Sequence, residues 1–216
     1  MPPVLYNITG SPPCGFIRTL AKKLGVELEL KNLDYFKKEH LTPEYLKINP
    51  FHKVPTLEDS GFVVYESVAI AYYLLRQYAP KSELYPECVK QRTRIDQILA
   101  AVSCTILPHK VAFFRPLLAE KRKPTSEEVA AFEENVLKGF EHLIGDDKFA
   151  AGDKVTLADF CLFSGIIGVL EMRFFNKAKF QKLSSYYERV LPEITGFDEI
   201  YKPAITHFQE RYGGLK

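Results

Sequence analysis

The sequence predicts an α/β domain over residues 1–79 and an all-helical domain over residues 89–216, joined by a linker at 80–88. Two observations lead to this prediction. Before residue 80, short β-rich runs alternate with stretches whose apolar residues recur at helical spacing. After residue 88, helical spacing continues almost to the end, and the residues between the two parts have the Pro and Ser content of turns.

The first domain opens with a strand, a helix and a second strand. Residues 4–8 (Val-Leu-Tyr-Asn-Ile) are β-rich, and a Thr-Gly pair ends the run. Ser11 is then a candidate N-cap with proline at the first helical position, and apolar residues at helical spacing extend as far as residue 24. Gly25 ends that helix, and the alternating residues 26–30 predict the second strand.

The rest of the first domain is predicted to contain a hairpin between helical segments. Residues 34–45 are polar, and we expect one or two short helical turns there. The runs at 55–58 and 62–65 flank Asp-Ser-Gly, which predicts a β-hairpin. A helix then opens at Ser67 and closes near Tyr78. The resulting order, β-α-β-α-β-β-α, resembles a thioredoxin-type domain.

Three helices are predicted for the second domain. The first runs from residue 89 towards residue 115 and is expected to kink at Pro108. The second covers residues 127–144. The third begins at Thr156, which is expected to cap it while Asp159 reaches back in a capping box. We interpret that motif as structural.

The composition limits the classes of protein and partner. Apolar residues make up 46% and charged residues 26% of the chain, the balance of a soluble globular protein. A net charge of +2 is too small to indicate nucleic acid or an anionic membrane surface as a partner. We see no signal-peptide pattern and expect no apolar stretch long enough to span a membrane, so the expected location is cytoplasmic. The four cysteines and five histidines lack the spacing of disulfide frameworks or metal sites, so no metal is expected.

The turn at residues 11–14 (Ser-Pro-Pro-Cys) is the first candidate for chemistry. In thioredoxin-type proteins a pair of cysteines occupies this place, and the positive end of the helix stabilises a thiolate. Here the first position is Ser11 and the remaining cysteine is Cys14, so we expect the reactive sulfur to belong to a bound thiol. The Ser11 hydroxyl can donate a hydrogen bond to that thiolate, or it can be a simple helix cap.

Further segments suit a small acidic peptide that carries the thiol. The Val54-Pro55 step is compatible with a cis peptide that clamps an extended peptide ligand, or with an ordinary edge-strand proline. Glu66 can pair with an ammonium group while Ser67 and the amides of its helix bind a carboxylate, or Ser67 can simply cap the helix. Three donor side chains flank this region and could hold the opposite carboxylate: His40, His52 and Lys53.

These motifs resemble those of the cytosolic glutathione S-transferases. The matching segments follow the family's order and cover essentially the whole chain: residues 11–14, 52–55, 65–70, 84–86 and 155–159. The Ser-Pro-Pro form and the Asn49-Pro50-x-His52 spacing are most similar to the arthropod delta and epsilon classes. The resemblance implies a homodimeric cytoplasmic enzyme of detoxification and xenobiotic metabolism, with glutathione as co-substrate and a hydrophobic electrophile as second substrate.

The resemblance also implies roles for individual residues. Ser11 would stabilise the glutathione thiolate, and Val54 next to Pro55 would clamp the cysteinyl backbone. Glu66 and Ser67 would hold the γ-glutamyl end. The glycine carboxylate would lie near His40, His52 and Lys53. The hydrophobic substrate would lie over the first helix of the second domain, at residues in helical register: Ile106, His109, Lys110, Phe113 and Phe114.

Other interpretations of the same residues stay open. Cys14 could be a mixed-disulfide nucleophile, which would make the protein a thiol transferase, and Tyr6 could replace Ser11 as the hydroxyl donor. The chain could also be a non-catalytic, glutathione-dependent carrier of hydrophobic ligands, or an interaction module on the same fold. Gly15 stands where the family commonly has an arginine, and the polar residues at 109 and 110 leave the substrate preference open.

Overall fold

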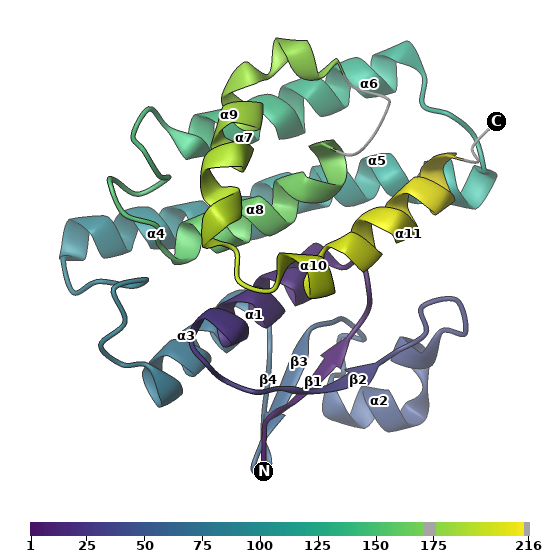
Figure 1. Ribbon diagram of the computed structural model, residues 1–216. Helices are drawn as coiled ribbons and strands as arrows, with labels where there is room; N and C mark the ends of the chain where they lie inside the picture. Colours follow the sequence, from purple (N-terminus) through teal and green to yellow (C-terminus); the bar gives the residue numbers. More distant parts are fainter. Residues whose placement is uncertain (171–175, 214–216) are drawn as a thin grey trace. The chain divides into compact units, whose positions relative to one another are not determined.

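The structure is a computed structural model that describes residues 1–170 and 176–213 (Figure 1). The chain forms two compact units. The first comprises Met1–Ser82 and Thr195–Ala204, and the second comprises Glu83–Ile194 and the chain from Ile205 onward. An α/β unit followed by a helical unit confirms the predicted fold class. The return of residues 195–204 to the first unit was not predicted.

Four strands form one mixed sheet in the first unit, in the order β2-β1-β3-β4 (Figure 1). The strands are β1 (Val4–Asn7), β2 (Glu29–Asn32), β3 (Thr56–Asp59) and β4 (Phe62–Tyr65). β1 runs parallel to β2 and antiparallel to β3, and β3 pairs with β4 as the predicted hairpin. Ser60 (φ 52°) and Gly61 (φ 85°) form its turn with the two positive φ angles that a tight hairpin turn requires.

The second strand begins later than the alternating pattern predicted. Its parallel register pairs Val4 with Glu29, and β1 ends at Asn7, so the ladder covers Glu29–Asn32 and not residues 26–30. The length of a ladder depends on the partner strand, and the local sequence pattern of β2 does not contain that information.

Helices cover both faces of the sheet (Figure 1). α1 (Pro12–Lys23) and α3 (Ser67–Tyr78) lie on one face and α2 (Pro43–Ile48), preceded by the short 3₁₀ turn Glu39–Leu41, lies on the other. α10 (Phe197–Ile200) packs against α1. Fully buried side chains from the sheet, α1 and α3 form the core of this unit, among them Leu5, Ile17, Leu20, Leu57, Ile70 and Leu74.

The second unit is built from helices. They are α4 (Val89–Ala101), α5 (Leu107–Glu120), α6 (Ser126–Phe132), α7 (Lys138–Ile144), α8 (Leu157–Leu170), α9 (Gln181–Val190) and α11 (Lys202–Gly213), which starts in the first unit. A π-helical turn, Val102–Ile106, joins α4 to α5, and another, Glu133–Leu137, joins α6 to α7.

The predicted long helix from Val89 is continuous as far as Glu120, because the π-helical turn connects α4 directly to α5. Pro108, where a kink was predicted, is the second residue of α5 and lies two residues after the end of this turn. Proline has no N–H, and its ring crowds the carbonyl four residues earlier, so a wider turn at this point accommodates it.

The run Val89–Glu120 also corrects an expectation about membranes. By length and composition it could cross one, since its most apolar 18-residue window has a mean hydropathy of 1.4. A packed core helix passes the same test, and 39% of this window is buried inside the protein. The run therefore gives only weak support for a membrane span.

α8 begins with a polar network in the core of the second unit. The Asp159 carboxylate accepts hydrogen bonds from the Thr156 N–H (2.7 Å) and hydroxyl (3.0 Å) through one oxygen. Its other oxygen accepts from the Ala150 N–H (2.9 Å) and the Tyr186 hydroxyl (2.7 Å). The predicted reach-back of Asp159 is confirmed, but the Thr156 hydroxyl donates to that carboxylate.

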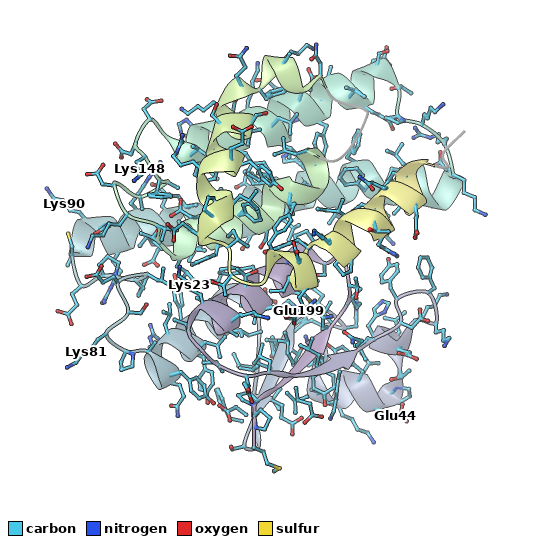
Figure 2. All side chains as sticks on the ribbon, in the orientation of Figure 1. Lys23, Glu44, Lys81, Lys90, Lys148 and Glu199 are labelled. Carbon is cyan, nitrogen blue, oxygen red and sulfur yellow. The ribbon has the colours of Figure 1, made fainter. Side chains whose placement is uncertain are left out.

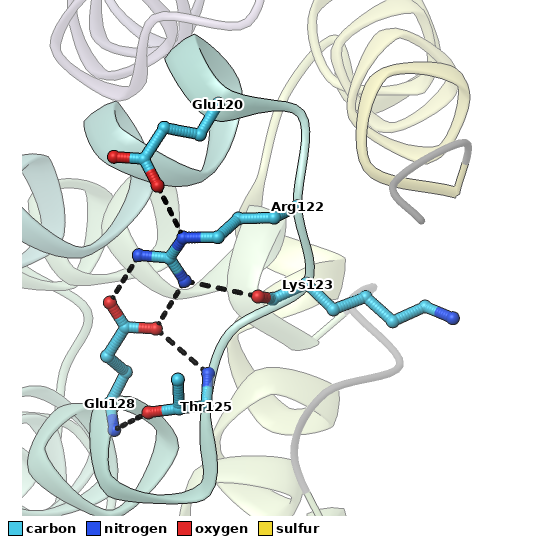
Figure 3. A network of polar contacts seen from close by, with 5 residues as sticks. All are labelled: Glu120, Arg122, Lys123, Thr125 and Glu128. Atoms are coloured by element: carbon cyan, nitrogen blue, oxygen red, sulfur yellow. Dashed lines mark hydrogen bonds and ion pairs between the residues drawn. The ribbon is translucent and has the colours of Figure 1, made fainter.

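α6 begins with a complete capping box nearer the surface (Figure 3). The Thr125 hydroxyl accepts from the Glu128 N–H (3.2 Å), and the Glu128 carboxylate accepts from the Thr125 N–H (2.9 Å). Arg122 donates to both Glu128 oxygens (2.7 and 2.8 Å) and to Glu120 (2.6 Å). This network fastens the end of α5 to the start of α6.

Candidate functional site

Ser11 stands at the N-cap of α1, where the sequence placed it. Pro12 and Pro13 follow and have no N–H, so the first amide N–H of the helix belongs to Cys14. The next one, on Gly15, donates to the Ser11 carbonyl (2.9 Å). Among the described residues, the Ser11 side chain makes no capping hydrogen bond. Its hydroxyl is therefore not used to cap the helix, and it lies within hydrogen-bonding reach of the Cys14 thiol in the same turn.

Cys14 lies one turn inside α1 and is 1% exposed. Burial raises the pKa of its thiol to about 11, even though a hydrogen bond with the Ser11 side chain acts in the opposite direction. The thiol therefore stays protonated at neutral pH, which argues against a nucleophilic role for Cys14.

The structure gives a reason for the glycine at position 15. A Cβ atom built on Gly15 would lie 2.9 Å from the ring of Tyr201. Tyr201 is buried, and the Thr19 hydroxyl donates to its hydroxyl (3.0 Å). The segment 195–204 therefore occupies the space that a larger side chain at position 15 would need.

Tyr6, the alternative donor, is engaged within the sheet. Its hydroxyl donates to Glu58 (3.3 Å) and accepts from Lys31 (3.5 Å). Its ring packs on Tyr45, with ring centroids 5.5 Å apart. These contacts direct the hydroxyl to charged partners on neighbouring strands and make Tyr6 a weaker candidate than Ser11.

The Val54–Pro55 peptide is cis, the form with which the sequence was compatible. The carbonyl of Lys53, just before it, accepts from the Tyr45 hydroxyl (2.5 Å) and from the Asn49 side-chain amide (3.0 Å). Tyr45 and Asn49 are buried and thus fix the loop that presents Val54. Neither residue was predicted to position this loop, although Asn49 belongs to the Asn-Pro-x-His spacing.

Glu66 and Ser67 lie at the start of α3, which opens at Ser67 as predicted. Glu66 is the N-cap and Ser67 is the first helical residue, so the alternative in which Ser67 caps the helix does not apply. Glu66 is exposed and has φ 68°, a conformation that non-glycine residues rarely adopt. This turn places a carboxylate next to the free amides of a helix N-terminus.

His40 and His52 lie close to each other, and Lys53 follows His52 in the chain. His40 stacks on Tyr35 (centroids 5.0 Å apart, planes 4° apart). Burial, and then the proximity of His52, lower the pKa of His40. The buried Nδ1 of His40 has no hydrogen-bond partner in the part of the chain that the structure describes. His52 and Lys53 are exposed.

The five residues predicted to contact a hydrophobic substrate lie in different environments. Ile106, Lys110 and Phe113 are buried in the second unit, whereas His109 is exposed and Phe114 is half-buried. Phe113 and Phe114 pack edge to face, with centroids 4.9 Å apart. The assignment of these residues to a substrate site stays a prediction.

Lys110 is a buried cation in this cluster. Its ammonium group donates to the Gly165 carbonyl and lies 5.9 Å from the ring centroid of Phe140. Burial lowers the pKa of Lys110 to about 8. Sequence periodicity correctly placed Lys110 on the same helical face as Ile106 and Phe113, but did not show that this face packs inside the unit.

Comparison with known proteins decides the family. Residues 1–76 match the model of the glutathione S-transferase N-terminal domain, and residues 68–192 match that of the C-terminal domain. The chain belongs to the glutathione S-transferase family. It is a glutathione transferase, an enzyme for which glutathione is a substrate, and its thioredoxin-like fold is the one that the sequence predicted.

Solved structures of insect glutathione transferases resemble this one along the whole chain. A delta-class enzyme from Nilaparvata lugens is 30% identical, with a TM-score of 0.90 and 100% of both chains covered. An epsilon-class enzyme from the housefly, Musca domestica, is 28% identical, with a TM-score of 0.89 and 99% and 98% of the two chains covered. A homologue from Drosophila mojavensis, solved with bound glutathione, is 28% identical, with a TM-score of 0.88 and 99% and 97% covered. These relatives confirm the predicted similarity to both classes.

Proposed function

We propose that this glutathione transferase conjugates the glutathione thiolate to hydrophobic electrophiles and that the Ser11 hydroxyl stabilises the thiolate. The observation that carries this proposal is the position of the Ser11 hydroxyl at the N-terminus of α1, where it makes no capping hydrogen bond among the described residues and contacts only the protonated thiol of Cys14 in the same turn. The buried, protonated thiol of Cys14 and the engaged hydroxyl of Tyr6 support Ser11 over the two alternatives.

The energy needed is within reach of this arrangement. Lowering a thiol pKa by about two units requires about 2.7 kcal/mol. A hydrogen bond to a charged group contributes about 1.5–3 kcal/mol, and the positive end of a helix adds about 0.3–1 kcal/mol. Ser11 and the N-terminus of α1 together thus supply a stabilisation of the size that the thiolate needs.

We assign the rest of the glutathione molecule to the loops around Ser11. The backbone of Val54, before the cis Pro55, would pair with the cysteinyl backbone. Glu66 would bind the γ-glutamyl ammonium group, and the amides that begin α3 at Ser67 would bind the carboxylate beside it. The donors assigned to the glycine carboxylate are His40, His52 and Lys53.

In the reaction, the thiolate sulfur attacks an electrophilic carbon of the second substrate. The S–C bond forms as the bond to the leaving group breaks, and the thiol proton passes to solvent. Proximity and electrostatic stabilisation of the thiolate supply the catalysis. We further propose a homodimeric, cytoplasmic enzyme of detoxification, in which accessible residues near His109 and Phe114 contribute to the electrophile site.

The deciding experiment compares the natural protein with Ser11→Ala in glutathione conjugation to an activated chlorinated nitrobenzene. We expect kcat/KM to fall about 10- to 100-fold, because one hydrogen bond to the thiolate is lost. Glutathione should still bind, with a higher thiol pKa in the complex. Tyr6→Phe and Cys14→Ala serve as controls, and both should retain most of the activity.

Other outcomes would change the assignment. Unchanged turnover in Ser11→Ala with a loss in Tyr6→Phe would move the thiolate donor to Tyr6. A selective loss in Cys14→Ala, together with activity towards mixed disulfides, would indicate a thiol transferase. Saturable glutathione binding without turnover in the natural protein would indicate a carrier.

A further inference from the structure

The turn between β2 and α2 carries two aromatic residues, Tyr35 and Phe36, to which the proposed chemistry assigns no role. The turn belongs to the first unit and precedes α2, whose exposed residue Glu44 is labelled in Figure 2. Tyr35 is 50% exposed, and Phe36 is exposed as well. Both rings therefore lie outside the core of the unit, and core packing does not account for them.

Hydrogen bonds hold this turn in a defined conformation. The Asp34 carboxylate accepts from the N–H groups of Phe36 (2.8 Å) and Lys37 (3.1 Å). The Glu39 carboxylate accepts from the Asp34 N–H (2.8 Å). An aspartate that bonds to the backbone two or three residues later is typical of tight turns. These contacts fix the backbone that bears Tyr35.

The ring of Tyr35 lies parallel to the imidazole of His40. The ring centroids are 5.0 Å apart and the planes differ by 4°. Phe36 meets the Tyr35 ring edge to face, with centroids 6.0 Å apart. His40 is half-buried, and burial is the main cause that lowers the pKa of its imidazole, followed by the proximity of His52. Rotation of the imidazole would break its contact with Tyr35, so the stack restricts His40 to one ring orientation.

The Nδ1 atom of His40 has no hydrogen bond that could orient the ring. This nitrogen is buried, and it has no hydrogen-bond partner among residues 1–170 and 176–213. A histidine that binds a ligand through one ring nitrogen is usually oriented by a hydrogen bond at the other. The contact with Tyr35 thus does the orienting that a hydrogen bond does in such sites.

We propose that Tyr35 is a positioning residue for glutathione, because its stack on His40 holds the imidazole in the orientation that binds the glycine carboxylate. This inference rests on the proposed function, in which His40, His52 and Lys53 hold that carboxylate. The electron-rich face of the tyrosine ring also favours the imidazolium form, which binds a carboxylate more strongly than the neutral ring does. The role concerns the glycine end of the ligand, so the thiolate and the chemical step should be unaffected.

The test compares glutathione with its glycine ethyl ester, in which the glycine carboxylate is blocked. Calorimetric titration measures the Kd of both ligands. Tyr35→Leu should weaken glutathione binding about three- to tenfold, because His40 loses its fixed orientation, and should change ester binding less than about twofold. KM for glutathione should rise, while kcat and the pKa of the bound thiol keep their natural values.

Three further variants show whether Tyr35 acts through His40. Tyr35→Phe keeps the ring and should bind glutathione as the natural protein does. Phe36→Leu removes the neighbouring exposed ring but leaves the stack, and should change the affinity less than about twofold. His40→Leu should also weaken binding of glutathione more than binding of the ester. Tyr35→Leu added to His40→Leu should cause no further loss, because two residues that act through one contact are not additive.

Several results would overturn the proposal. Equal losses for glutathione and the ester in Tyr35→Leu would indicate a merely structural role, and so would additive losses in the double variant. If only His40→Leu distinguishes the two ligands, the role of Tyr35 fails and the assignment of His40 stands. If neither variant distinguishes them, the assignment of His40 fails as well, whereas conjugation by the natural protein tests the transferase proposal separately. Tyr35→Gln repeats the test if the leucine variant does not fold.

Discussion

α6 and α8 both begin with a threonine that is followed three residues later by an acidic residue, but the first helix end lies near the surface and the second in the core. At α6, Thr125 is exposed and Glu128 binds a side chain from the preceding loop, Arg122 (Figure 3). At α8, Thr156 and Asp159 are both fully buried. The same motif, a threonine followed three residues later by an acidic residue, therefore begins helices in two different environments.

Burial changes how much a helix cap contributes to stability. Water can satisfy the amides of α6 if the box opens, so that box fixes only the local turn. Almost every residue of α8 is buried, and no water replaces a lost partner there. The shorter acid Asp159 accordingly accepts four hydrogen bonds from three separate segments, including one from Tyr186 of α9.

Removal of the core carboxylate should have the largest effect. Asp159→Ala leaves the donors of Ala150, Thr156 and Tyr186 without their acceptor, and each buried donor left unpaired costs about 1–3 kcal/mol. We expect the free energy of unfolding to fall by about 3–5 kcal/mol, measured by urea denaturation. Asp159→Asn, which keeps the shape and one acceptor oxygen, should fall in between. A loss below about 1 kcal/mol for Asp159→Ala would show that Asp159 does not hold this polar network together.

The corresponding change at the surface should be smaller. Thr125→Ala removes the hydroxyl that accepts from the Glu128 N–H, and the loss of such a cap costs about 1 kcal/mol. The same urea titration measures this effect. If Thr125→Ala destabilised the protein as much as Asp159→Ala, the environment of the cap would not decide its importance.

The smallest expected effect is a difference in acid response. Arg122 holds the pKa of Glu128 down at about 2. The stability that this carboxylate provides is therefore fully present above the ordinary pKa of a glutamate, and it is lost as the pH falls from that ordinary value through the lowered pKa of about 2. Burial raises the pKa of Asp159 in the folded protein. The stability linked to this shift is therefore kept when the pH falls, and it is lost as the pH rises through the pKa that Asp159 has in the folded protein.

Thermal midpoints measured between about pH 6 and about pH 3 test this difference in sign. The midpoint gap between the natural protein and Glu128→Gln should shrink as the pH falls. The gap for Asp159→Asn should not shrink. The same trend in both variants would mean that burial does not separate the two carboxylates.

Much of the fold and of the candidate site was predictable because local rules govern those parts. The hairpin followed from its turn residues, the capping motif at Thr156 from its spacing, and the position of Ser11 from the Ser-Pro pair. The errors concern partners that are distant in the sequence. The start of β2 depends on the register of β1, and the burial of Lys110 depends on a carbonyl 55 residues further along the chain.

The role of Gly15 illustrates the same limit. It appeared as a departure from the family pattern, and only the packing of Tyr201, 186 residues later, explains it. The N-cap role of Glu66 was missed for a different reason. A positive φ at a glutamate is unfavourable, so no sequence preference indicates it.

The return of residues 195–204 to the first unit also has a consequence for synthesis on the ribosome. The face of α1 at Gly15 and Thr19 is covered by Tyr201, and a nascent chain lacks this residue until the helical region that precedes it has been translated. The N-terminal sheet and its helices can emerge early, but they carry an uncovered apolar face while the whole helical region is being made. A face that is made early is thus completed by a segment that is made much later.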